Sequence, residues 1–150
     1  MKLMKAKLCI LALIFALAAC KSSDPEPSSP IEGTWKIQSV ILTDADGQET
    51  NFWALYVAFF PCSAEITYTF DANGTYSTFV PAGCVDDDGE TLALLSGTGG
   101  SYTLTGSTIQ VDVDGSTLPG NITFSGNTAT VTTVDPDDLT STLTIVFVKA

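Results

Sequence analysis

Apolar and polar residues alternate along most of the chain from Gly33 onward, and this period of two restricts the fold to packed β-strands. Within 66–70, for example, apolar side chains share one face of the expected strand and threonines share the other. Short runs containing Gly and Asn, typical of tight turns, separate these segments. We expect strands near 34–42, 64–70, 75–80, 100–105, 108–114, 120–125, 128–134 and 141–148.

Consecutive strands with one apolar face need either closure or a second sheet to bury that face. Tight turns between sequence neighbours favour an all-β, eight-stranded, antiparallel up-and-down barrel, and a two-sheet sandwich is the alternative. One segment, 51–60, departs from period two because its aromatic residues recur at spacings of three and four. It predicts a short helix or turn after the first strand, lying across one mouth of the barrel.

The N-terminal region has the composition of an export signal. Lys2, Lys5 and Lys7 flank an apolar stretch that is too short to span a bilayer. Leu17-Ala18-Ala19-Cys20 resembles the lipobox of bacterial lipoproteins, although an ordinary signal with a chance cysteine is the alternative. The resemblance implies cleavage before Cys20 and a lipid anchor on its sulfur, with acyl chains such as palmitate.

The expected organisation therefore has three parts: a signal peptide at 1–19, the lipidated cysteine with a Pro/Ser-rich tether at 20–32, and a barrel domain at 33–150. Lys21, rather than aspartate, follows Cys20, which favours the outer membrane by the sorting rule of Gram-negative lipoproteins. Asp24 and Glu26 resemble the tethers of surface-exported lipoproteins, so the periplasmic and external faces both stay open.

Cysteine usage predicts one disulfide. Cys9 leaves with the signal and Cys20 is acylated, so Cys62 and Cys84 are the thiols that remain in an oxidising compartment. A metal or catalytic thiol pair is the alternative, but the chain has no histidine and these cysteines lack CxxC spacing. We therefore expect a Cys62–Cys84 bond.

Charge and composition argue against several functions. After processing, three lysines face seventeen acidic residues, a formal charge of −14 that repels nucleic acid. Without histidine, arginine or a free thiol, the usual catalytic constellations are missing, so we expect no enzyme activity and no cofactor. The acidic loops at 44–47, 86–90 and 112–115 are incomplete as calcium sites, and we assign no metal, while weaker cation binding stays open.

The first strand opens with Gly33-Thr34-Trp35, which resembles the G-x-W opening of the lipocalins. The wider pattern of Cys62, the hairpin TYTFDANGTYSTF at 67–79, Cys84 and a hydrophobic last strand resembles the lipocalin-like domains of Gram-negative lipoproteins. The chain departs from eukaryotic lipocalins because it has no arginine to cover Trp35, no second T-D-Y motif and no room for a C-terminal helix. Lys149 is the late cation that can lie over Trp35 instead.

The resemblance implies binding or sequestration of a small hydrophobic ligand inside the barrel. The residues expected at that site are aromatic or aliphatic: Tyr68, Phe70, Val111, Phe124 and Phe147 as inward side chains, with Trp53, Tyr56 and Phe59 as a lid. The alternative is a filled barrel, a structural or accessory outer-membrane lipoprotein that docks on an envelope protein partner. A cavity of several hundred cubic ångströms distinguishes the two.

Overall fold

A computed structural model describes residues 29–85, 95, 98–113, 115–135 and 138–150. The predictions for the signal peptide, Cys20, most of the tether and the acidic loop at 86–90 lie outside these residues. Over the described residues the elements, in chain order, are β1 (Gly33–Thr43), β2 (Glu49–Asn51), α2 (Phe52–Phe59), the 3₁₀ helix η1 (Pro61–Glu65), β3 (Thr67–Phe70), β4 (Thr75–Phe79), β5 (Gly99–Thr105), β6 (Thr108–Val113), β7 (Ser116–Ser125), β8 (Thr128–Val134) and β9 (Thr142–Lys149).

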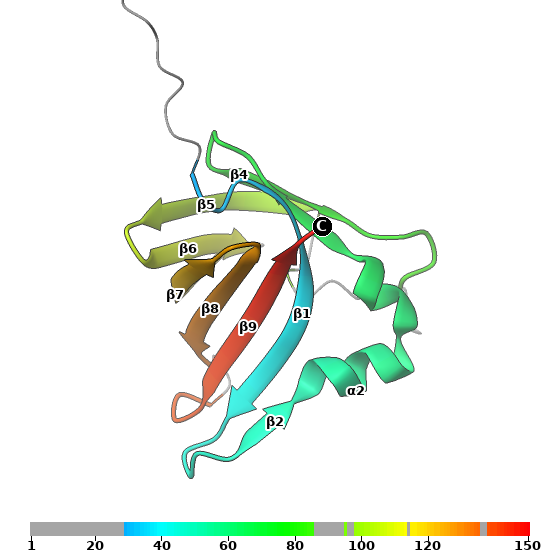
Figure 1. Ribbon diagram of the computed structural model, residues 1–150, viewed down its shortest axis with the longest axis vertical. Coiled ribbons are helices and arrows are strands. Elements are labelled where there is room, and N and C mark those ends of the chain that lie inside the picture. Colours follow the sequence, from blue (N-terminus) through cyan, green and yellow to red (C-terminus); the bar gives the residue numbers. More distant parts are fainter. Residues whose placement is uncertain (1–28, 86–94, 96–97, 114, 136–137) are drawn as a thin grey trace, which may run out of the picture.

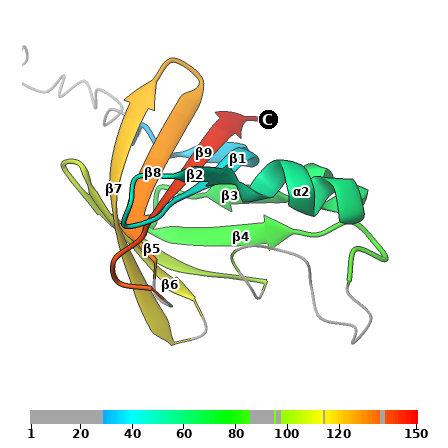
Figure 2. The ribbon, with the colours of Figure 1, turned by 90° about the horizontal axis from the view of Figure 1, so that it is seen from below.

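The sheet closes on itself. β1 pairs with β3, each strand from β3 to β8 pairs with the next strand in sequence, and β9 pairs back onto β1. All of these pairings are antiparallel. Within the described residues the ring contains eight strands, while the short β2 pairs only with the far end of β1. Figures 1 and 2 show this ring from two directions, with α2 beside β1. The barrel prediction is confirmed over the sandwich.

Strand register identifies the inner face. Trp35 lies opposite Tyr68, and Ile37 lies opposite Phe147, so these apolar side chains point to the same side of the sheet. A bulge after Ile37 shifts the register of β1, so that Val40 rather than Ser39 continues the inner face. The inner face is thus the apolar face that sequence alternation predicts.

The two ends of the barrel differ. At one end, tight turns connect β3 to β4, β5 to β6 and β7 to β8, and the described chain starts there at residue 29. We call this the closed end. At the other end, the connection from β1 to β3 carries β2, α2 and η1, and the β8–β9 connection also lies there. We call this the mouth.

The aromatic segment 51–60 forms α2, as its spacing predicts. Asn51 caps the helix, since its Oδ1 accepts a hydrogen bond from the Ala54 N–H at 3.3 Å. Pro61 starts η1 immediately afterwards, because its fixed φ suits the first position of a helix. The expected strand at 64–70 therefore starts later, at Thr67, which corrects that boundary.

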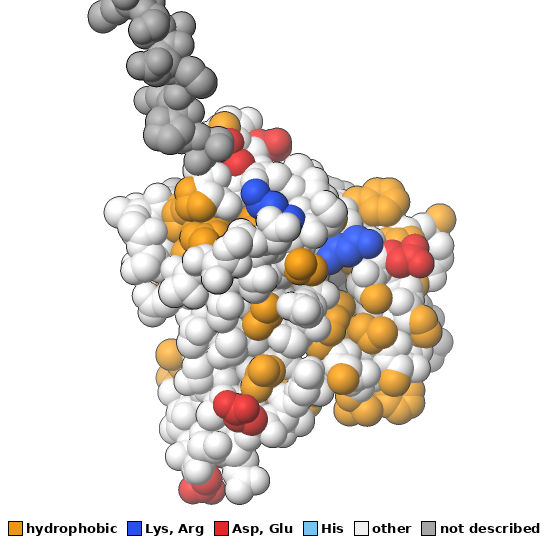
Figure 3. All heavy atoms as spheres, viewed as in Figure 1, with side chains coloured by type: hydrophobic (Ala, Val, Ile, Leu, Met, Phe, Trp, Pro, Cys, Tyr) orange, Lys and Arg blue, Asp and Glu red, His pale blue; other side chains and the backbone are white. Residues whose placement is uncertain are grey.

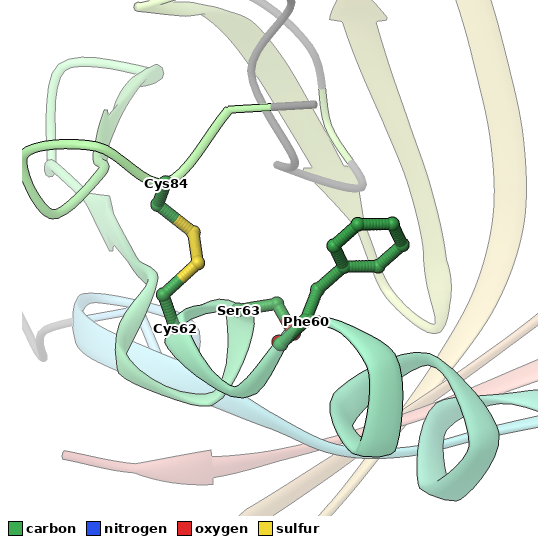
Figure 4. The surroundings of a disulfide bond; sticks show 4 residues. All are labelled: Phe60, Cys62, Ser63 and Cys84. Atoms are coloured by element: carbon green, nitrogen blue, oxygen red, sulfur yellow. A yellow bond between two sulfur atoms is a disulfide. The ribbon is translucent and has the colours of Figure 1, made fainter. Parts of the chain in front are cut away.

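A disulfide joins the two connections that surround β3 and β4. Cys62 of η1 bonds to Cys84, which follows β4, with 5.7 Å between their α-carbons (Figure 4). Beside it, the Ser63 hydroxyl donates to the Phe60 carbonyl at 2.6 Å and ties η1 to the end of α2. The predicted disulfide is confirmed, and Cys84 is completely buried. In the described part of the chain, no helix has both the length and the apolarity to cross a membrane.

Candidate functional site

The barrel encloses a cavity of about 650 Å³. Its walls come mainly from the inner faces of β6 to β9, which present aliphatic side chains at alternate positions. This volume falls within the range of small-molecule sites in proteins, roughly 300–1,000 Å³. The side chains that line it include Val111, Ile122, Val131, Leu143, Ile145 and Phe147.

Aromatic packing around Trp35 forms the floor of the cavity at the closed end. The Trp35 indole is 1% exposed, and its Nε1 donates to the Ile31 carbonyl at 2.7 Å. Its ring lies 6.4 Å from that of Phe124, and the Lys149 Nζ sits 5.2 Å from the indole centre. Lys149 thus covers Trp35 by a cation–π contact, in the position expected from the sequence.

A second aromatic group closes the barrel between β3 and β5. The Phe70 ring stacks on Tyr76 at 5.7 Å and meets Tyr102 edge-on at 5.2 Å. The Tyr102 hydroxyl donates to the Asp71 carbonyl at 2.8 Å. Burial raises the pKa of this phenol above its usual value, with a further contribution from the charges of Glu32 and Asp71. Tyr102 is therefore a fixed, neutral part of the wall at physiological pH.

Exposed apolar side chains surround the opening of the cavity. Leu118, Val134 and Leu139 all line it, although each is substantially exposed and Leu139 reaches 79%. Leu95, from the β4–β5 connection, also lines the cavity but is buried. Such an apolar rim is typical of a binding site that an apolar molecule enters from solvent.

Hydrogen bonds of Asp138 order the β8–β9 connection that carries Leu139. Its Oδ2 accepts from the Ser141 hydroxyl at 2.6 Å, and its Oδ1 accepts from the backbone N–H and hydroxyl of Thr140 at 3.1 and 2.7 Å. These bonds, with that of Ser141 foremost, hold the pKa of Asp138 below its usual range. The carboxylate is therefore ionised at neutral pH and fixes the rim.

The chemistry of the lining is apolar and uncharged. None of the described residues that line the cavity is ionisable, and its polar groups are threonines and one asparagine. Among the described residues, no cluster of three or more metal-ligating side chains occurs. The cavity can therefore bind a molecule through shape complementarity and apolar contacts.

The aromatic residues of α2 line a separate recess of about 380 Å³, together with Val40 of β1. Trp53 stacks on Tyr56 at 5.8 Å, and Tyr56 meets Phe60 at 5.3 Å. Trp53 is 9% exposed and belongs to the core, whereas Phe59 is 73% exposed. Figure 3 shows hydrophobic side chains gathered at the lower right, where Figure 1 places α2.

The sequence-predicted ligand residues thus fall into three places. Phe70, Val111 and Phe147 line the larger cavity. Tyr68 and Phe124 do not: Tyr68 is fully buried and meets Phe147 edge-on at 6.1 Å, while Phe124 packs on Trp35. Trp53, Tyr56 and Phe59 line the recess of α2 instead, because α2 packs against β1 and η1, whereas the cavity walls come mainly from β6 to β9.

Sequence reasoning missed several lining residues. Leu143 and Ile145 alternate with threonine in β9, so the sequence could have predicted that they point inward. The same alternation applies to Val131 in β8. Leu118 and Leu139 carry no such signal, because one precedes a proline and the other lies in a loop. Their place at the rim follows only from the closed barrel.

A match to a known protein family agrees with this architecture. Residues 31–128 match the family described as a lipocalin-like domain. No curated protein matches the chain. Similar solved structures include a lipocalin-like protein from Bacteroides uniformis, with 14% identity and a TM-score of 0.46 over 81% of this chain and 100% of that one. A triple mutant of the bovine odorant binding protein is similar with 16% identity and a TM-score of 0.42, over 81% of this chain and 75% of that one.

Proposed function

The chain belongs to the family of lipocalin-like domains, and on that premise we propose that it holds a small hydrophobic molecule inside its barrel at the bacterial cell envelope. One observation carries the proposal: a cavity of about 650 Å³ with an apolar lining and an apolar rim. Burial of an apolar ligand there gains roughly 25 cal/mol for each Å² removed from water. The protein acts as a carrier or a sequestering protein and not as an enzyme.

The competing proposal is a structural lipoprotein that docks on a protein partner. A filled barrel would favour it, but the aromatic residues around Trp35 fill only the closed end and leave the cavity between β6 and β9 open. The observation that favours docking is the exposed apolar face of α2, where Phe52, Leu55 and Phe59 are exposed. The two functions are compatible, since this face and the cavity have different residues.

The anchor completes the proposal. A lipid on Cys20 would hold the barrel at the outer membrane, as the lipobox resemblance and Lys21 suggest. The described chain enters the barrel at residue 29, at the closed end (Figure 1). A tether that joins there would leave the mouth directed away from the anchoring membrane, and a ligand would exchange with the surrounding aqueous compartment.

Titration with the uncharged dye Nile red tests ligand binding. The dye gains fluorescence in an apolar site, so we expect saturable binding to the wild-type protein. The double variant Val131→Trp/Leu143→Trp fills the cavity and should weaken binding at least tenfold. Thr130→Trp/Thr144→Trp is the matched control, because by the register these residues point to the outer face of the same two strands. Equal binding by both double variants would contradict a site inside the barrel.

A further inference from the structure

We propose that the cavity selects uncharged amphiphiles that carry a hydrogen-bond donor and excludes carboxylates such as fatty-acid anions. This inference rests on the proposed function, because it names the class of molecule that the same cavity takes. It follows from the distribution of cations in the chain, from the charge around the mouth and from one hydroxyl at the rim.

Within the described residues, neither lysine, Lys36 nor Lys149, lines the cavity, so no cation there pairs with a bound carboxylate. The chain has six lysines, no arginine and no histidine, and four of the lysines lie at positions 2–21. Lys36 lies opposite Val148, on the outer face of β1, because its neighbours in sequence point inward. Lys149 is exposed at the closed end, where it lies over the Trp35 ring and does not line the cavity. A carboxylate that enters the apolar lining would therefore lose its hydration without gaining a cationic partner, and should bind more weakly than an uncharged head group.

The mouth carries negative charge. Asp138 is adjacent to Leu139, Asp135 follows Val134, and Asp112 accepts a hydrogen bond from Thr117 at 2.6 Å. Each of these three carboxyl groups thus adjoins a residue that lines the cavity. Hydrogen bonds from Thr117 and Ser101 hold the pKa of Asp112 below its usual range, as those of Ser141 and Thr140 do for Asp138. Ionised carboxylates beside the entrance repel an approaching anion.

Thr133 provides the polar contact. Its partner across the sheet is Leu143, so its side chain lies on the inner face, and it lines the cavity. The Thr133 hydroxyl donates its proton to the Pro119 carbonyl at 2.6 Å, with the Val134 carbonyl as a second, longer acceptor at 3.4 Å. Since a hydroxyl has one proton, the Thr133 oxygen can take part in a further hydrogen bond only as an acceptor. An alcohol or an N–H group can donate to Thr133, whereas a carboxylate has no proton to give.

A matched pair of ligands tests the selection. We measure displacement of Nile red from the purified protein by 1-decanol and by decanoate at pH 7.5, since the two share a chain length and differ in the head group. The expected result is binding of decanol with decanoate at least tenfold weaker. Thr133→Val should weaken decanol about fivefold, the loss of one ordinary hydrogen bond. Thr130→Val, on the outer face, should leave both unchanged.

A gain of function gives a second, independent readout. Thr133→Lys places a cation on the inner face and should raise the affinity for decanoate at least tenfold relative to wild type. If decanol and decanoate displace the dye equally well, or neither displaces dye that binds, the selection is wrong and the carrier function stands. If Nile red itself does not bind, the carrier function fails and the inference fails with it.

Discussion

At the scale of single residues, the contacts of Trp35 explain why a tryptophan occupies the start of the first strand. The indole is buried on the inner face, its Nε1 bonds to the Ile31 carbonyl, and Lys149 lies over its ring. Lys149 was identifiable from the sequence because it is the one late cation available in a chain without arginine. The contact between the first and the last strand then helps to fix the closure of the barrel.

Asp138 makes the stability of the mouth depend on pH. Because its pKa is lower in the folded protein than in the unfolded chain, its stabilising contribution is complete above the ordinary carboxyl value of about 4 and is lost as the pH falls through the folded value. We expect Asp138→Asn to reduce the loss of unfolding free energy between pH 6 and pH 2.5, as measured by urea denaturation.

Substitution of the main hydrogen-bond donor provides the control. Ser141→Ala should move the pKa of Asp138 back toward its ordinary value, as followed by NMR titration of the side-chain carboxyl group, since the Ser141 hydroxyl is the largest cause of the shift. An Asp138 pKa that Ser141→Ala leaves in place would show that this hydrogen bond does not set it.

At the scale of elements, α2 combines a buried and an exposed side. The sequence predicts the helix from its aromatic spacing, and Asn51 and Pro61 bound it. It could not predict which aromatic residues are buried, because every residue of α2 is apolar and no polar residue opposite the aromatic stripe marks the exposed face. It also missed β2, since the three residues of that strand are exposed and show no alternation.

Two substitutions in α2 should therefore have different effects. Trp53 is part of the core, so Trp53→Ala should lower the free energy of unfolding by about 3 kcal/mol. Phe59 is largely exposed, so Phe59→Ala should change it by no more than about 0.5 kcal/mol. Urea denaturation followed by circular dichroism measures both. Similar losses in the two variants would contradict the observed orientation of the helix.

The disulfide links η1 to the segment after β4 and closes a loop with a sequence separation of 22 residues. Replacement of both cysteines, Cys62→Ala/Cys84→Ala, should lower the free energy of unfolding by about 3 kcal/mol, because the unfolded chain regains the entropy of that loop. Thermal and urea denaturation of the oxidised wild-type protein and the variant measure the difference. A variant as stable as the wild type would show that native contacts alone hold these connections together.

At the scale of the whole molecule, closure was predictable and the cavity was not. Eight short amphipathic strands with tight turns leave few ways to bury one face, which is why the sequence supports the barrel. Whether the interior is filled depends on where the large side chains lie along the barrel axis. Trp35, Tyr68 and Phe124 gather near the closed end, whereas β6 to β9 contribute mainly aliphatic residues around the cavity.

Removal of the expected lipid site tests the anchor. Cys20→Ser should release the protein from the membrane into the soluble fraction, because the acyl chains supply the hydrophobic area for stable attachment. The wild-type protein should fractionate with the outer membrane, and Cys62→Ala/Cys84→Ala, which leaves Cys20 intact, serves as the control. A Cys20→Ser variant that stays in the membrane fraction would contradict anchoring through this residue.

The central claim is that the barrel encloses a cavity that holds a small uncharged hydrophobic molecule. Native mass spectrometry of the protein, purified gently as the Cys20→Ser variant from its native host, tests this claim most directly. We predict an additional mass of a few hundred daltons that is lost on denaturation and is absent when Val131→Trp/Leu143→Trp fills the cavity. Detection of only the bare chain, with Nile red also failing to bind, would contradict the claim.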